Sequence, residues 1–270
     1  MNTMTVIQVL LSLMLAIVEI WIVNPNSSVT AYRVTELELS NSSFDIDSAI
    51  SRPEDTSGDI SYEIVYFGHY EQDGDPENGT EDIEWFILAT DEQENRTLLL
   101  SRYGLAVHNF DSTNREGVLW YNCLLRQWLN QTFLQEAFNE YEIRYIEPSS
   151  ISSPVYIGSN LESDTDQEGT KDCVFLLSYQ EIERFFPSAL ARRCKPTTVA
   201  KKELVVEAII TSVDGVGFDL WFTRTVDKAS SNMVIIYDDG TFGIAPSWIE
   251  IQVRPAIWVN NDGLTGLICP

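Results

Sequence analysis

A chain of 270 residues in which 44% of the side chains are hydrophobic can bury roughly 70–75% of the surface that it exposes when unfolded. It has 41 acidic and 17 basic residues, which gives a formal net charge of −24. Eighteen of the acidic residues lie between Glu36 and Glu94, where Arg52 is the single basic residue. Because this negative field repels nucleic acid and anionic membranes, we exclude both as partners. The simplest interpretation is a solvated acidic surface that keeps an exported protein soluble.

The first 31 residues predict export. Residues 4–23 are mostly apolar, which suits the hydrophobic region of a signal peptide or an N-terminal membrane anchor. Val29 and Ala31 are small residues at the positions that signal peptidase requires, whereas Glu19 and the lack of an upstream Lys or Arg favour an uncleaved anchor. Both alternatives predict a secreted or cell-surface protein that touches a membrane only through this segment, if the segment stays uncleaved.

The sequence has four cysteines, an even number that allows three disulfide pairings: Cys123, Cys173, Cys194 and Cys269. None belongs to a CxxC pair, and the two histidines, His69 and His108, are distant from them in sequence, which argues against a zinc site. One or two disulfides and four buried free thiols are both compatible with this spacing.

Composition divides the rest of the chain into a polar acidic spacer at 32–59 and a single α+β domain at 60–270. Within the domain, Asp238-Asp239-Gly240 predicts a hairpin turn that leads to the last strand. Alternating or short apolar runs predict strands at 60–68, 83–89, 96–101, 173–177, 218–223, 232–237 and 249–259. The strands at 83–89 and 96–101 are expected to be the two arms of a hairpin around residues 91–95.

Two helices are predicted from spacing and from capping residues. Trp120 and Trp128 lie on one apolar face of a helix over 120–130, and Asn130 is expected to end it because Asn tolerates a left-handed C-cap. Residues 133–138 predict a separate short helical segment.

The second helix follows a capping box, in which the Ser178 hydroxyl accepts from the Glu181 amide while the Glu181 carboxylate reaches back to the Ser178 amide. We expect this helix to run through Phe186, because Pro187 restricts the residue before it.

Eight short motifs occur in order along residues 60–259, and together they resemble one known family. They are Phe67-Gly68-x-Tyr70-x-Gln72, Ile83-Glu84-Trp85-x-x-Leu88, Leu125-Arg126-x-Trp128-Leu129-Asn130-x-x-Phe133, Ala137-Phe138, Phe175-Leu176-Leu177-Ser178-x-x-Glu181, Thr198-x-Ala200, Trp221-x-x-Arg224 and Val253-Arg254-Pro255-Ala256. The chain is similar to an uncharacterised bacterial domain family of exported and surface proteins that has no established activity. It departs from that family at two places. The usual W-W-L-R-S is here Leu220-Trp221-Phe222-Thr223-Arg224-Thr225, and the serine that often precedes L-R is replaced by Cys123 with an inserted leucine.

The C-terminal motifs also resemble C-type-lectin-like domains and formylglycine-generating enzymes. This resemblance implies an α+β fold in which small twisted antiparallel sheets lie beside two main helices, with function in long loops. The two helices would be those predicted at 120–130 and after Ser178. The four cysteines do not match the reactive pair of the formylglycine-generating enzymes, so we do not expect that activity.

Calcium is the one cofactor that the sequence suggests. Asp164, Asp166 and Glu168 place oxygen donors at alternate positions, as calcium-binding loops do, but Phe175 stands where an EF-hand has its closing glutamate. The alternative is that these are exposed acidic turns without a metal. A second loop has the same spacing and the same alternative: Asp73, Asp75 and Glu77.

The candidate ligand-binding residues are in the C-terminal third: Trp221, Arg224, Trp248 and Arg254. The tryptophans, together with Trp258, can stack on sugars, although their strand spacing also suits a core. Arg254 also suits a structural ion pair with a carboxylate.

No local motif pairs a nucleophile with a histidine, so we name no catalytic residue. We expect an exported or surface-displayed binding module whose ligand is a glycan or a surface protein. Its contact region is expected in the loops around 160–172 and 225–248. The alternative is an extracellular glycan hydrolase that uses carboxylates.

Overall fold

The computed structural model describes residues 33–35, 62–113, 115–158, 161–164, 169–204 and 220–265. The expected export segment, most of the spacer, and the calcium candidates Asp166 and Glu168 lie outside these ranges, as does the side chain of Asp164. No helix within the described ranges is long and apolar enough to cross a membrane. The described chain is mostly β-sheet with several short helices, which confirms the α+β composition.

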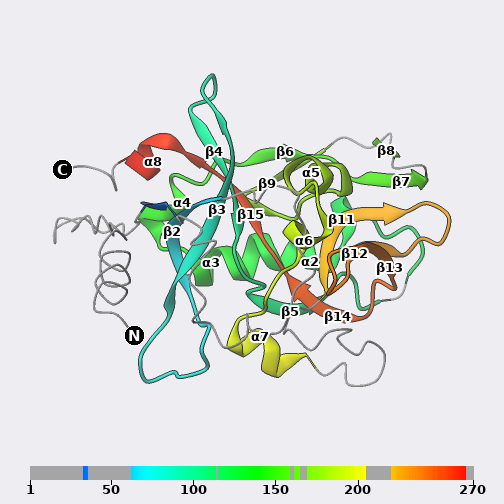
Figure 1. Cartoon of the computed structure of the whole chain (residues 1–270), viewed down its shortest axis with the longest axis horizontal. Helices are drawn as coiled ribbons and strands as arrows, with labels where there is room; N and C mark the ends of the chain where they lie inside the picture. Colours follow the sequence, from blue (N-terminus) through cyan, green and yellow to red (C-terminus); the bar gives the residue numbers. More distant parts are fainter. Residues whose placement is uncertain are drawn as a thin grey trace, which may run out of the picture.

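A six-stranded antiparallel sheet combines both ends of the described chain (Figure 1). Its strands, in spatial order, are β1 (Arg33–Thr35), β2 (Glu63–Tyr70), β3 (Glu81–Asp91), β4 (Arg96–Ser101), β15 (Ala256–Asn260) and β10 (Val174–Phe175). Strands β3 and β4 form the predicted hairpin, with Asp91 paired to Arg96 at its tip. Because β15 lies between β4 and β10, residues distant in sequence become neighbours there.

A second sheet has seven strands: β13 (Phe242–Ala245), β12 (Met233–Ile236), β11 (Trp221–Asp227), β14 (Glu250–Val253), β5 (Ala106–Asn109), β7 (Pro154–Gly158) and β8 (Leu161–Asp164). Strand β7 pairs with β11, and β8 pairs with β7. Strand β11 runs parallel to both β14 and β7, whereas the resemblance implied antiparallel sheets.

The strand predicted at 249–259 is two strands, β14 and β15, in different sheets. Arg254 and Pro255 separate them, and a proline has no amide hydrogen to continue a ladder. The arm that follows the Asp238-Asp239-Gly240 turn is therefore β13, which pairs with β12. The V-R-P-A motif therefore lies where the chain crosses from one large sheet to the other.

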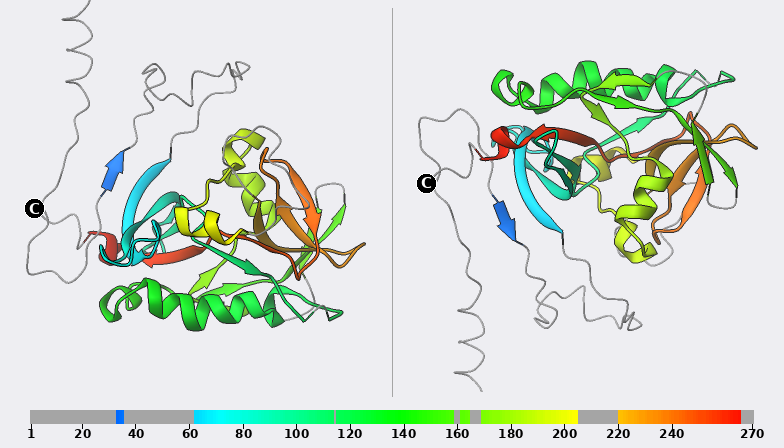
Figure 2. Two further views of the ribbon diagram at one scale, coloured as in Figure 1. Left: turned by 90° about the horizontal axis from the view of Figure 1, so that it is seen from below. Right: turned by 90° about the horizontal axis from the view of Figure 1, so that it is seen from above.

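The remaining elements are short: η2 (Trp120–Asn122), α2 (Leu124–Trp128), η3 (Leu129–Phe133), α3 (Leu134–Ala137), α4 (Glu140–Ile143), β6 (Ser149–Ile151), β9 (Thr170–Asp172), α5 (Tyr179–Phe185), α6 (Ala189–Arg192), α7 (Thr198–Glu203) and α8 (Asn261–Thr265). Figure 2 shows α2, η3 and α3 as one long green helix along one side of the molecule, with the yellow-green α5 and α6 on the other side of the strands.

The predicted helix at 120–130 begins later and extends further. The Cys123 sulfur accepts from the Arg126 amide and caps α2, and the backbone stays helical through the π-helical stretch η3 to Ala137. Asn130 therefore lies inside the helix, and the prediction that it ends the helix is wrong. The separate segment predicted at 133–138 is the end of this same helix.

Most of the described buried apolar residues form one hydrophobic cluster, with members from both large sheets and from the long helix. Gly68 shows how closely the long helix approaches β2. It has a φ of +74°, and a Cβ at this position would lie 2.6 Å from both the Ala137 carbonyl oxygen and the Phe138 ring. The glycine of the F-G motif is therefore required by its backbone conformation and by the packing.

Candidate functional site

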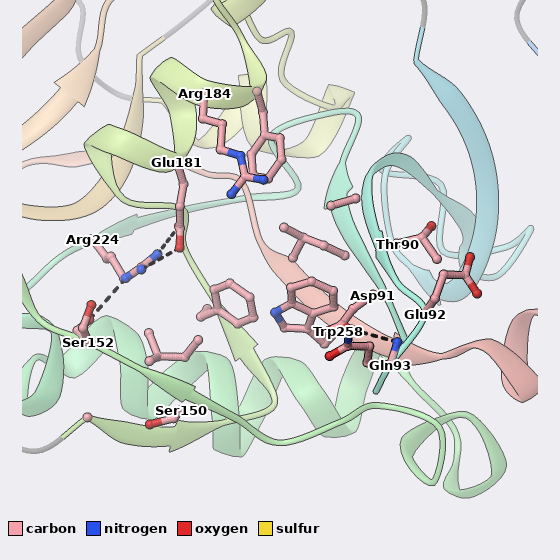
Figure 3. Close-up of a pocket in the computed structure, with 16 residues that line it drawn as sticks. Thr90, Asp91, Glu92, Gln93, Ser150, Ser152, Glu181, Arg184, Arg224 and Trp258 are labelled. Carbon is pink, nitrogen blue, oxygen red and sulfur yellow. Dashed lines mark hydrogen bonds and ion pairs between the residues drawn. The ribbon is translucent and has the colours of Figure 1, made fainter. Parts of the chain in front are cut away.

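An open groove of about 830 Å³ lies between α5, the tip of the β3–β4 hairpin and β6 (Figure 3). This volume is typical of a site for a small molecule. The lining comes from both large sheets, from α5 and from β6, which pairs with β9 in a separate two-stranded sheet. The lining residues are Ala89, Thr90, Asp91, Glu92, Gln93, Leu98, Ser150, Ile151, Ser152, Gly169, Phe175, Glu181, Arg184, Phe185, Arg224 and Trp258.

Aromatic rings form the middle of the groove. Phe175 on β10 and Trp258 on β15 line the groove from neighbouring strands, and Figure 3 shows the Trp258 ring near the centre of the site. Leu98 is directly opposite Trp258 on β4. The Arg96 guanidinium carbon is 4.6 Å from the centre of the Trp258 ring and covers one of its faces. A partly exposed indole beside hydroxyl and carboxylate groups is suited to the apolar face of a sugar ring.

Glu181 and Arg224 form an ion pair that joins two of the sequence motifs. Arg224 Nη2 donates to Glu181 Oε1 at 2.8 Å, and Nη1 donates to Oε2. The predicted capping box is confirmed, because the same Glu181 carboxylate accepts from the Ser178 amide and the Ser178 hydroxyl accepts from the Glu181 amide. Arg224 also donates to the carbonyl oxygens of Leu176 and Ser152.

This ion pair sets the charge of the Glu181 carboxyl. Burial acts to raise the pKa of Glu181, but the charge of Arg224 and its hydrogen bonds outweigh burial and hold the pKa below its ordinary value. Glu181 is therefore ionised at neutral pH, which makes it unsuited to act as a general acid.

The two ends of the groove differ in charge. Arg184 on α5 lines one end and forms no ion pair within the described residues. Asp91 and Glu92 line the other end, at the hairpin tip. Asp91 is engaged by Arg96 at 3.5 Å and by two backbone amides of its own turn, whereas exposed Glu92 has no ion pair to any described residue.

Asn130 attaches the long helix to the strand that enters the groove. Its Oδ1 accepts from the amides of Cys173 and Val174 at 2.8 and 3.1 Å, and its Nδ2 donates to the Val174 carbonyl at 2.8 Å. The Asn130 side chain thus satisfies the hydrogen bonds of backbone groups next to Phe175, which lines the groove.

The Asp172 carboxylate, at the end of β9, is completely buried, and both of its oxygens accept hydrogen bonds. It accepts from Arg126 Nε at 2.7 Å, from Trp120 Nε1 at 2.8 Å and from the Thr170 hydroxyl at 2.6 Å. The arginine of the L-R-x-W-L-N motif is therefore a structural partner of a buried charge.

Arg254 of the V-R-P-A motif is buried among aromatic rings. Its guanidinium carbon lies 5.0 Å from the Trp221 ring centre, 5.4 Å from that of Phe186 and 5.7 Å from that of Phe86. Nε donates to the Ser101 carbonyl, and burial lowers the pKa of the guanidinium. It forms no carboxylate pair within the described ranges, so the ion pair expected there is wrong, because aromatic faces occupy its surroundings.

The four predicted ligand-binding residues lie in different environments. Arg224 lines the groove. Trp221 and Arg254 are buried, and Trp221 donates its indole N–H to the Arg192 carbonyl, which corresponds to the alternative of core residues. Trp248 is 49% exposed but is not among the residues that line the groove.

The calcium prediction at 164–168 lies outside what the structure describes. In the second acidic loop, the carboxylates that lie within 4.8 Å of one another are those of Glu71, Asp73 and Glu81. Asp75, predicted from spacing, instead accepts from the Glu77 amide in a turn. Glu71 and the strand residue Glu81 thus stand in this cluster in place of Asp75 and Glu77, because the loop folds back on β3.

Sequence patterns missed most of the groove. Trp258 was considered only as one of several tryptophans, and Arg184, Asp91 and Glu92 had no distinguishing spacing. Among the lining residues, Arg224 was predicted to bind ligand, and Phe175 and Glu181 belong to one of the sequence motifs. The three described cysteines, Cys123, Cys173 and Cys194, are free thiols, and Cys269 lies outside the described residues.

Fold and site together define an α+β protein with an open groove lined from both of its large sheets. The chain belongs to the family described as Domain of unknown function (DUF6273), which it matches over residues 94–261. This fits the uncharacterised family expected from the motifs, although two of the eight motifs lie before residue 94. No curated protein and no solved structure matches the chain.

Proposed function

We propose that this protein is an exported or surface-displayed binding module that takes a carbohydrate in the groove between α5 and the β3–β4 hairpin. The observation that carries the proposal is Trp258, a partly exposed indole on the groove floor. Sugar rings present an apolar face that stacks on an indole, and hydroxyl groups around the edge that bond to Ser, Thr, Gln and carboxylate side chains. The groove has all of these groups, so its chemistry fits a sugar better than a purely apolar ligand.

Export is part of the proposal and is supported by the apolar segment at 4–23. Secretion followed by cleavage after Ala31 leaves Tyr32 as the first residue. N-terminal sequencing of protein recovered outside the producing cell tests this point. A C-type-lectin-like fold is also part of the proposal, and two main helices beside antiparallel hairpins support it.

The test uses the whole purified protein on an array of neutral, acidic and amino oligosaccharides, with calcium and again with chelator. Trp258→Ala is compared with Trp248→Ala, a matched control in which an exposed indole outside the groove is removed. Ser150→Tyr, at an exposed position of the lining, obstructs the groove without opening the core.

The expected result is retention of a defined class of oligosaccharide that Trp258→Ala and Ser150→Tyr abolish and Trp248→Ala preserves. If the chelator abolished retention, binding would depend on calcium. No retention of any oligosaccharide, or equal loss in all three variants, would overturn the proposal.

A carboxylate-dependent glycan hydrolase is the second candidate, because three carboxylates line the groove: Asp91, Glu92 and Glu181. Glycosidases use two such groups, one of them as a general acid. Glu181 is committed to Arg224, which leaves Asp91 and Glu92 as the pair to examine. Release of reducing ends from an oligosaccharide, lost in Asp91→Asn or Glu92→Gln, would favour this candidate over binding alone.

A further inference from the structure

The charges that line the groove divide into those already neutralised and those still free. Glu181 and Arg224 neutralise each other. Asp91 faces Arg96, at 3.5 Å. Arg184 and Glu92 are left, and neither is within ion-pair distance of a described residue of opposite charge. The Arg184 guanidinium lies over the Phe185 ring, and its charge helps to lower the pKa of Glu181 without forming a pair with it.

These two free charges have opposite sign and belong to opposite walls. Arg184 extends from α5, and Glu92 lies at the tip of the β3–β4 hairpin. Figure 3 shows Arg184 on one side of the groove and Glu92 on the other, with Trp258 between them. A ligand stacked on Trp258 therefore has a cation on one side and a carboxylate on the other.

From this arrangement we infer that the saccharide taken by the groove is zwitterionic, with a carboxylate that meets Arg184 and a free amino group that meets Glu92. The inference rests on the proposed function and specifies its ligand class. Each contact is a charge-assisted hydrogen bond, which is stronger than a bond between neutral groups.

The charge of the whole chain supports a ligand without net charge. A formal charge of −24 repels a polyanion as it approaches, although Arg184 offers a local anion contact. A purely cationic sugar is attracted but leaves Arg184 unused. A zwitterion is not repelled at long range and satisfies both free charges.

The test is a titration of the whole protein with four disaccharides on one β-1,4-linked glucosamine framework. They are the N-acetylated sugar, the free amine, the N-acetylated C6 uronate, and the sugar with both a free amine and a uronate. Tryptophan fluorescence or calorimetry gives the affinities at low and at physiological salt.

We expect the zwitterionic sugar to bind about tenfold more tightly than the neutral one, because each exposed charge pair contributes about threefold. Arg184→Gln should lower affinity about threefold for the two sugars with a uronate and leave the others unchanged. Glu92→Gln should do the same for the two sugars with a free amine.

Matched controls are available outside the groove. Arg144→Gln removes an exposed arginine that follows α4, and Glu94→Gln removes a carboxylate from the same hairpin turn. Equal or tighter binding of the neutral sugar, or charge variants that affect all four sugars alike, would overturn the inference while leaving the proposed function in place. Failure of all four sugars, together with an empty oligosaccharide array, would overturn both.

Discussion

Asn130 on the long helix and Val174 on β10 are joined by two hydrogen bonds although 44 positions separate them in sequence. The side-chain amide of Asn130 pairs with the backbone of Val174 as a neighbouring strand would. The asparagine of the W-L-N motif thus connects the helix to the strand that carries Phe175 into the groove.

Asn130→Ala should therefore destabilise the protein strongly. Removing the amide leaves the backbone N–H groups of Cys173 and Val174 without their acceptor, at a cost of about 3 kcal/mol in the free energy of unfolding. Urea unfolding of the variant measures this. Gln131→Ala, at the exposed neighbouring position, is the control and should change stability by less than about 0.5 kcal/mol. Similar effects at the two positions would contradict the role given to Asn130.

Glu181→Gln should change how stability depends on acid. The pKa of Glu181 is lowered in the folded protein, so its contribution to stability is present above its ordinary pKa and is lost as pH falls through the lowered value. The variant should be about 2 kcal/mol less stable at neutral pH, less than for a fully buried pair because Glu181 is 35% exposed. It should also lose less stability than the wild type on acidification. Unfolding curves over a pH series, with exposed Glu116→Gln as control, would show this, and parallel pH profiles for wild type and Glu181→Gln would refute it.

At Glu142 the contribution to stability should depend on pH in the opposite direction. Its side chain is completely buried, Oε1 has no hydrogen-bond partner, and His69 Nδ1 lies 3.9 Å away. Burial raises the pKa of Glu142, while the Asn139 amide and His69 act in the other direction. Because the pKa of Glu142 is raised in the folded protein, its contribution to stability is fully present below the ordinary pKa of a glutamate. That contribution is lost as the pH rises through the raised pKa.

Glu142→Gln should remove that loss, so its stability relative to the wild type should increase as the pH rises above about 4, the ordinary pKa of a glutamate. Chemical unfolding at several pH values measures the difference. Glu136→Gln, exposed on α3, should follow the wild type throughout. A relative stability of Glu142→Gln that stays constant with pH would show that Glu142 titrates as it does in the unfolded chain.

Gly68→Ala should destabilise the contact between β2 and the long helix. The new methyl group would lie 2.6 Å from the Ala137 carbonyl oxygen, in a backbone conformation that costs about 1–2 kcal/mol for other residues. We expect a loss of about 3 kcal/mol or more in thermal or urea unfolding. Gly79→Ala is the matched control: it has a φ of +91° but open space around its Cβ, so it should lose only the backbone cost. Equal losses would mean that packing contributes nothing at Gly68.

Patterns within a few residues predicted local structure well. The β3–β4 hairpin pairs Asp91 with Arg96, next to the predicted turn, and the Ser178–Glu181 capping box starts α5 as expected. These interactions join residues three to five positions apart, so local sequence contains most of the information that they need.

Predictions failed where a distant partner decided the outcome. Asn130 was expected to end a helix, but the backbone of Val174 holds it within one. Arg254 was expected to meet a carboxylate, but three aromatic rings from separate elements surround it. The spacing of side chains along the sequence does not indicate which distant residues Asn130 and Arg254 will contact.

The sequence by itself determined the acidic charge, the α+β class, the family and the capped helix, because these depend on composition and on short-range order. Only the tertiary structure decided that Arg224 pairs with Glu181 and that Trp258 lies between Arg184 and Glu92. The physical reason is the strand order, in which β15 inserts between β4 and β10 and the chain changes sheets at Pro255. Strand pairing between distant segments is what assembles the groove.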